Sequence, residues 1–485
     1  MARRNQSNQS SRTRGRGGNG KKNSSGILIA VVAVAALALV GAVVYFLTRS
    51  DNYTFQRSHL ETYLEQTAEQ PALLSSEGAD VYFDMSDGMN CAFSPATATP
   101  TCQQILKSLI NKLASDKNTF YRLAQLKITP LEMPFTEVYN YLLDKKNYSN
   151  QMAPIEKTLD AINTSGKPAV LITDYEEYKG ERIEKGAYAK KMFTEWLAKG
   201  FDIYFYKWGF EEYGKQKYLF VTVFDDATAQ LNKQVEQALS DVDPSISKFV
   251  VAGREFDYPV TPDDTPGRKV YLTPVKGGNY HGDKNIDNVS NVLEDGSSEA
   301  YARFESLRTE YYPLGVDWQN ASQNAITFSD SNVPDSLRYS HFLSGLFVDF
   351  SAQDGYDIEN VALHTTDMDS VMQNWALNGA ADGVSTPEVK MLLDVSLEAA
   401  KRPNLKGWDE IVIDFDKNFA VPANPNALIR AQVVIAEANV NRSRIEEFFT
   451  WTDNPSLAAS VKLALQVDSS SPKGRVIYTY YIKVI

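Results

Sequence analysis

The longest apolar stretch of the chain runs from Ile27 to Leu47, 21 residues without a charged side chain. As a helix rising about 1.5 Å per residue it would be roughly 30 Å long, the thickness of a bilayer's hydrocarbon core. Residues 1–26 carry seven Arg and Lys side chains and no acid. The pattern predicts a disordered basic tail (1–26) on the cytoplasmic side, one transmembrane helix (27–47) and an exported remainder.

A cleaved signal peptide is the alternative interpretation of this N-terminus. The apolar run is longer than the 7–15 residues typical of a signal peptide, and no small-residue cleavage site follows it. A signal anchor is therefore the favoured prediction, and the bacterial inner membrane, with the bulk of the chain in the periplasm, is the expected location.

After a polar stalk (48–78), short apolar runs alternate with helical periods. The alternation is typical of an α/β fold, an open, doubly wound and mostly parallel sheet with helices on both faces. We expect this domain to span 79–245. Its predicted strands are 81–83, 120–128, 169–172, 201–206 and 218–224, and its predicted helices are 105–113, 152–162, 188–197 and 231–239.

From residue 246 to 485 the pattern indicates strands, and we expect an antiparallel, sandwich-like β-rich module. A long loop is expected at 276–300, a short helix at 444–451, and a hairpin loop at 468–474 between the last two strands. The predicted strands are 248–252, 269–273, 346–350, 389–397, 410–415, 428–436, 460–467 and 475–485.

Charge and cysteine content restrict the function. The net charge is −12, and beyond the membrane run 42 basic residues face 61 acidic ones. Such an acidic exported body argues against nucleic-acid binding and favours metal ions or basic partners. The chain has two cysteines, Cys91 and Cys102, and export to an oxidising compartment favours a disulfide between them, with two free thiols as the alternative.

Acidic side chains follow two of the predicted strands. Asp84 and Ser86 come after the first strand, and Asp174 follows the run at 169–172. In open α/β sheets ligands bind at the carboxyl ends of the strands. Oxygen atoms from separate segments suit Mg²⁺ or Ca²⁺. The plain alternative is that both aspartates only bond to local amides.

The segment Asp84-x-Ser86-x-Gly88 resembles the D-x-S-x-S motif of von Willebrand factor A domains, and 168–174 is similar to that family's later strand, which ends in Thr-Asp. The resemblance covers about 79–240. It implies a metal-ion-dependent adhesion site with Asp84, Ser86 and Asp174 as ligands. Ser149 is nearest in position to the family's middle-loop threonine, Thr136 is a weaker match, and Gly88 stands where the family has its second serine.

The resemblance predicts a binding protein that engages another envelope protein, possessing no catalytic residue, with an oligomeric state that the sequence leaves open. One alternative is an exported phosphohydrolase, because 83–88 superficially resembles the haloacid dehalogenase-like motif. That motif needs a second acid where Ser86 stands, and Asp87 is out of register by one. The other alternative is a structural envelope scaffold with a degenerate site.

Overall fold

The structure is a computed structural model whose chain divides into two compact units, residues 1–60 and 61–485. The predicted tail, the membrane span, most of the stalk, the strand at 269–273 and the loop at 276–300 lie outside the residues it describes. Among the helices that it describes, none has the length and apolar composition needed to cross a bilayer. The described residues are 62–63, 66, 72–93, 100–148, 152–212, 214–253, 258–262, 303–304, 309–314, 343–367, 371, 393–401, 403–415, 428–451 and 454–484.

In the described part of the chain, seven strands form one open sheet in the order β3-β2-β1-β4-β8-β7-β9. Strand β1 pairs in parallel with β2 and β4. The other four neighbouring pairs are antiparallel. The parallel pair β1–β4 is the one whose strands end at or next to the predicted site residues Asp84 and Asp174. The strands are Asp80–Asp84 (β1), Thr119–Ala124 (β2), Lys127–Pro130 (β3), Ala169–Thr173 (β4), Asp202–Glu212 (β7), Lys215–Asp225 (β8) and Ser247–Val251 (β9).

Helices cover both faces of this sheet, as the alternating pattern predicts. In β4, Leu171 faces one apolar core while Val170 and Ile172 face the other. Fully burying such an aliphatic side chain contributes about 1.5–3 kcal/mol, so the two cores fix the helices on the sheet. The first core contains α6 (Ile155–Ser165) and α7 (Lys190–Ala198), and the second contains α4 (Pro100–Leu113), α5 (Phe135–Leu143) and α8 (Gln230–Ser240).

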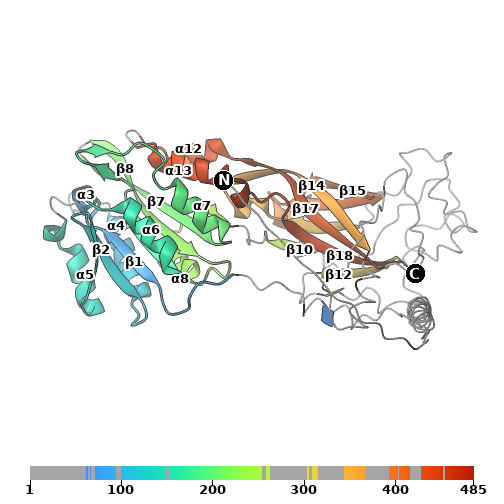
Figure 1. Cartoon of the computed structure of the whole chain (residues 1–485), viewed down its shortest axis with the longest axis horizontal. Coiled ribbons are helices and arrows are strands. Elements are labelled where there is room, and N and C mark those ends of the chain that lie inside the picture. The colour runs from blue at the N-terminus through green and yellow to red at the C-terminus, as the bar shows by residue number, and fades with distance from the viewer. Residues whose placement is uncertain are drawn as a thin grey trace, which may run out of the picture. The chain divides into compact units, whose positions relative to one another are not determined.

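Two helices from the far end of the chain complete the first core. They are α12 (Arg442–Phe449) and α13 (Ser456–Leu465), and Figure 1 shows them beside α7 and β7. The ring of Phe449 lies edge-to-face 4.8 Å from Phe205 on β7 and stacked 6.3 Å from Phe220 on β8. Aromatic pairs of these kinds each add about 0.5–1.5 kcal/mol to the stabilisation from the area that they bury.

The helix predicted at 444–451 is confirmed by α12, whereas the strand predicted at 460–467 is wrong. That segment lies mostly in α13, where Leu457, Val461 and Leu465 recur at helical spacing and are buried. The expected hairpin loop at 468–474 consequently connects a helix to the last strand.

Two larger sheets lie outside the α/β sheet, and β5 (Tyr178–Lys179) and β6 (Arg182–Ile183) pair as a separate two-stranded sheet. A four-stranded antiparallel sheet has the order β10-β13-β16-β15, and a five-stranded sheet has the order β11-β12-β18-β17-β14. In the second, β12 and β18 are parallel and the other pairs are antiparallel. The strands are Val260–Pro262 (β10), Arg303–Phe304 (β11), Thr309–Leu314 (β12), Leu343–Val348 (β13), Tyr356–Asp367 (β14), Leu393–Ala399 (β15), Asp409–Phe415 (β16), Leu428–Val440 (β17) and Val476–Val484 (β18).

The predicted domain boundary at residue 245 is too early. Strand β9 begins at Ser247 and pairs with β7 in the α/β sheet, from Ile203↔Val251 to Lys207↔Ser247. Together with α12 and α13, it makes the α/β sheet depend on residues that the sequence pattern assigned to the β-rich module. Pairing with a distant strand leaves no mark in the local alternation of apolar and polar positions, which explains the misplacement.

Candidate functional site

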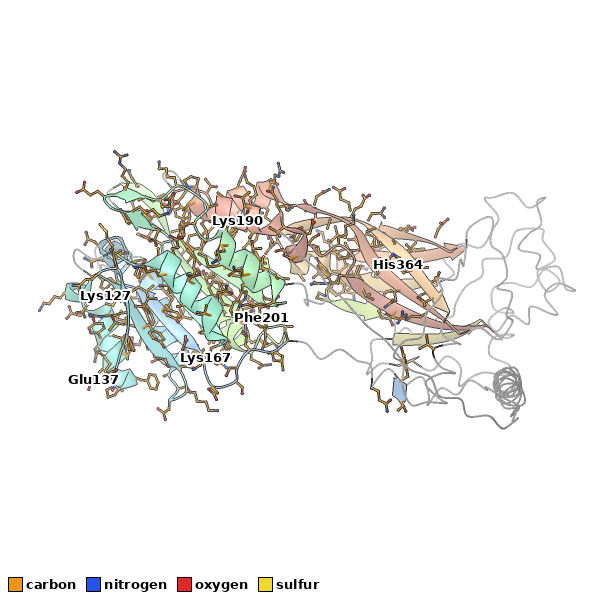
Figure 2. The ribbon with its side chains drawn as sticks, viewed as in Figure 1. Lys127, Glu137, Lys167, Lys190, Phe201 and His364 are labelled. Carbon is orange, nitrogen blue, oxygen red and sulfur yellow. The ribbon has the colours of Figure 1, made fainter. Side chains whose placement is uncertain are left out.

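The first acid of the candidate site ends strand β1. Asp84 is 2% exposed, and its two carboxylate oxygens accept hydrogen bonds from Ser86 N (2.8 Å at Oδ1) and Thr173 Oγ1 (2.7 Å at Oδ2). Since β1 and β4 are parallel neighbours, both strands end at the same edge. In Figure 2, Lys127 follows the turn after β2 at this edge, and Lys167 precedes β4 at the opposite edge.

The second acid follows β4 and belongs to a short segment, 173–177, that we call the site loop. Asp174 is 2% exposed, and its Oδ1 accepts a hydrogen bond from Glu176 N at 2.9 Å. A Cβ atom added to Gly88 would lie 3.0 Å from Asp174 Oδ2 and 3.8 Å from Lys217 Nζ. Lys217 Nζ in turn donates to Glu176 Oε2 at 2.9 Å. The structure thus gathers two predicted acids, a third acid and a lysine.

The site loop has a strained backbone that several distant segments hold in place. Tyr175 is fully buried and has φ +57°, a left-handed conformation that costs a non-glycine residue about 1–2 kcal/mol. Its hydroxyl donates to Thr222 Oγ1 at 2.9 Å. Its carbonyl accepts from Tyr188 OH at 3.1 Å and from Asn454 Nδ2 at 2.9 Å. These contacts fix Asp174 and Glu176 on either side of Tyr175.

The site loop carries two glutamates that are buried, although the segment 175–182 is rich in charged residues. Glu176 and Glu177 are only 6% and 7% exposed. Glu177 Oε2 accepts a hydrogen bond from Glu156 N, at 3.0 Å, in the first turn of α6. A carboxylate at a helix N-terminus satisfies an otherwise unpaired amide and interacts favourably with the helix dipole. Glu177 therefore caps a helix, and Glu176 is the glutamate that joins the site.

Burial dominates the electrostatics of the site. It raises the pKa of Asp84, against hydrogen bonds from Thr173 and Ser86 that lower it. It also raises the pKa of Asp174 well above its usual range. The charges of Glu176 and Asp84 raise that pKa further, and Lys217 lowers it. Removing a carboxylate from water favours its neutral form unless a cation is near, and Lys217 supplies that cation.

The geometry tests whether this site fits a divalent ion. Asp84, Ser86 and Asp174 offer the oxygen atoms that Mg²⁺ or Ca²⁺ prefers, but Ser149 lies outside the described residues. Among the residues that the structure describes, no group of three or more His, Cys, Asp or Glu side chains is arranged to hold a metal ion. The Lys217 ammonium, 2.9 Å from Glu176 Oε2, already brings a positive charge to these carboxylates, and the divalent ion stays a prediction.

The other predicted chemistry can also be located. Asp87, the acid closest to the phosphohydrolase pattern, is exposed and lies in the first turn of α3 (Asp87–Phe93). Cys102 is buried in α4, but the side chain of Cys91 lies outside the described residues, so the disulfide stays a prediction. Thr136, the weaker match to the middle-loop threonine, lies in α5.

Sequence reasoning missed three residues that shape this site. Thr173 is visible in the Thr-Asp step but was not expected to bond to Asp84. Lys217 and Asn454 come from β8 and from the turn between α12 and α13, 41 and 279 residues from their partners in the site loop. No local pattern identifies such distant partners.

Comparisons with known proteins give no relative for this chain. No protein-family model, no curated protein and no solved structure matches it. The resemblance to von Willebrand factor A domains accordingly rests on the motif residues alone.

Proposed function

We propose that this chain is a membrane-anchored binding protein whose α/β domain engages a protein partner in the cell envelope at the carboxyl edge of its sheet. The proposal combines the basic tail and apolar run at 1–47 with the motif resemblance around Asp84 and Asp174. In this arrangement the tail is cytoplasmic and the α/β domain and both smaller sheets are extracytoplasmic.

The observation that carries the proposal is the strained, fully supported site loop. Left-handed non-glycine backbone persists only where the surroundings over-determine it, and it is concentrated at binding and active sites. Here Tyr175 is held by side chains from β8, from the segment before α7, and from the turn after α12. A preformed edge lowers the ordering cost that a partner would otherwise meet on binding.

The residues beside the loop favour binding over catalysis. Ser86 hydrogen-bonds to the Asp84 carboxylate through both its backbone amide and its side chain, so it serves to fix that buried acid. Asp87, three residues after Asp84 in the first turn of α3, is exposed and can contact a partner.

Photo-crosslinking in native membranes tests the proposed edge. A photoreactive amino acid would replace Asp87 at the carboxyl edge or, as a matched control, Asp116, an exposed aspartate between α4 and β2 at the opposite edge. We expect a discrete adduct from position 87, none from position 116, and loss of the adduct when Asp174→Asn is added. Equal adducts at both edges, or none, would refute docking at this edge and favour a structural scaffold.

A further inference from the structure

One basic side chain reaches the acids of the candidate site. The side chain of Lys217 is 15% exposed and that of its partner Glu176 is 4% exposed, with 2.9 Å between Nζ and Oε2. In seven other ion pairs of the described residues at least one side chain is more than 30% exposed. Water therefore screens the Lys217–Glu176 pair less than it screens these seven.

Strand topology explains why a lysine lies there. Strand β8 runs antiparallel to β4, with Phe220 opposite Thr173, the last residue of β4. Lys217 precedes Phe220 by three residues, so it extends past the end of β4 and lies over the site loop. A parallel neighbour of β4 would end at this edge of the sheet. Because β8 is antiparallel, it begins beyond this edge, and its first residues, including Lys217, lie there.

The position of Gly88 is a second, independent observation. A Cβ at this residue would meet Asp174 Oδ2 at 3.0 Å, tighter than nine in ten real Cβ contacts, and would lie in ordinary contact with Lys217 Nζ at 3.8 Å. The serine that the similar motif has at this position would therefore push against the Asp174 carboxylate. Gly88, which has no side chain, therefore leaves room for Asp174 next to Lys217.

We infer that Lys217 is the resident cation of this site, occupying the place that a divalent ion holds in metal-ion-dependent adhesion sites, and that the carboxyl edge keeps its structure without a metal. This inference rests on the proposed function, because it concerns the carboxyl edge at which the partner is proposed to bind. Lys217 is a positioning residue: its ion pair with Glu176, the residue after Tyr175, helps to hold the site loop in its left-handed turn. A fixed ammonium makes the edge insensitive to metal supply.

Metal analysis and thermal unfolding of the full-length chain test the inference. Elemental analysis of the purified wild-type chain should find no stoichiometric Mg²⁺, Ca²⁺ or Mn²⁺, and its Tm should be the same in EDTA and in millimolar concentrations of each ion. Lys217→Met should lower the Tm in EDTA, and a divalent ion should restore several degrees, because it binds only the folded form. Lys215→Met, an exposed lysine on the same strand, is the matched control and should change neither quantity.

Three results would overturn the inference: a stoichiometric metal in the wild-type chain, a metal-dependent Tm in the wild-type chain, or a Lys217→Met variant as stable as wild type and indifferent to metal. If Lys217→Met does not fold in EDTA, Lys217→Arg keeps the positive charge and should keep a metal-independent Tm. These readouts do not involve a partner. A failed crosslink would refute the proposed function alone, and a metal-dependent Tm would refute this inference alone.

Discussion

Replacing Asp202 by asparagine should change how the stability of the protein depends on pH. Asp202 begins β7 and is completely buried, at the edge of the sheet opposite the candidate site. Its Oδ1 accepts a hydrogen bond from Gly253 N at 2.6 Å, and its Oδ2 accepts one from Tyr204 OH at 3.2 Å. Burial raises the pKa of Asp202 from 3.8 to about 7, even though these hydrogen bonds lower it.

The direction and size of the change in the free energy of unfolding with pH follow from the linkage between proton binding and folding. Between the two pKa values the folded chain binds the Asp202 proton and the unfolded chain does not, so the free energy of unfolding falls as the pH rises. The shift from 3.8 to about 7 corresponds to roughly 4 kcal/mol, at about 1.4 kcal/mol per pH unit. The contribution of Asp202 is most favourable below its unfolded-state pKa and is lost by the time the pH exceeds its folded-state pKa.

Urea unfolding of wild type and Asp202→Asn across this pH range measures the effect. Asparagine keeps an acceptor for Gly253 N and cannot ionise, so the stability of the variant relative to wild type should rise by about 4 kcal/mol from acidic to mildly alkaline pH. Asp241→Asn, at an exposed aspartate after α8, is the control and should show a far smaller trend. A stability difference that stays constant with pH, or changes in the opposite direction, would refute the assignment of a buried, proton-binding Asp202.

Three further changes have expected outcomes. Gln125 and Leu126 both have positive φ, 52° and 57°, in the two-residue turn between β2 and β3, so replacing them by Asn-Gly should raise the free energy of unfolding by about 1–2 kcal/mol in urea titrations. A loss of stability would show that the exposed leucine contributes packing that outweighs the strain. Asn454→Ala removes a buried donor to the strained carbonyl of the site loop and should cost about 1–3 kcal/mol by the same assay, more than a surface amide would. The predicted Cys91–Cys102 disulfide should make the Tm fall on reduction, equivalent to about 2–4 kcal/mol, and unchanged Tm with two alkylatable thiols would exclude it.

The local pattern of apolar and polar residues was sufficient to predict most strands and helices of the α/β sheet. The run Ala169–Thr173 is apolar without interruption because both of its faces are covered, and such runs identify buried strands. The faces of α4 and α8 repeat at helical spacing because each has one buried side. The positions of Asp84 and Asp174 at strand ends followed from these assignments and from the rule that ligands bind at the carboxyl edge.

The local sequence pattern could not predict which distant segments pack against one another. In 460–467, Val461, Leu463 and Leu465 alternate as in a strand and also recur as in a short helix, and only packing on the α/β sheet decides between the two. Lys217 reaches the site because a hairpin inserts β8 beside β4, an order that no local spacing encodes. The same insertion places the Lys217–Glu176 ion pair beside the two predicted aspartates.

The dependence of the first apolar core on α12 and α13 has a consequence for biosynthesis. The chain is made from its N-terminus, and the last strand of the α/β sheet is complete at Val251, roughly 200 residues before α13 ends. At about 5–20 residues per second, that interval lasts on the order of 10–40 seconds. During it the aromatic face that includes Phe205 and Phe220 has no cover from Phe449. A chain of this design spends that time exposed to aggregation, so it requires either a holding chaperone or folding that starts only after α13 has been made.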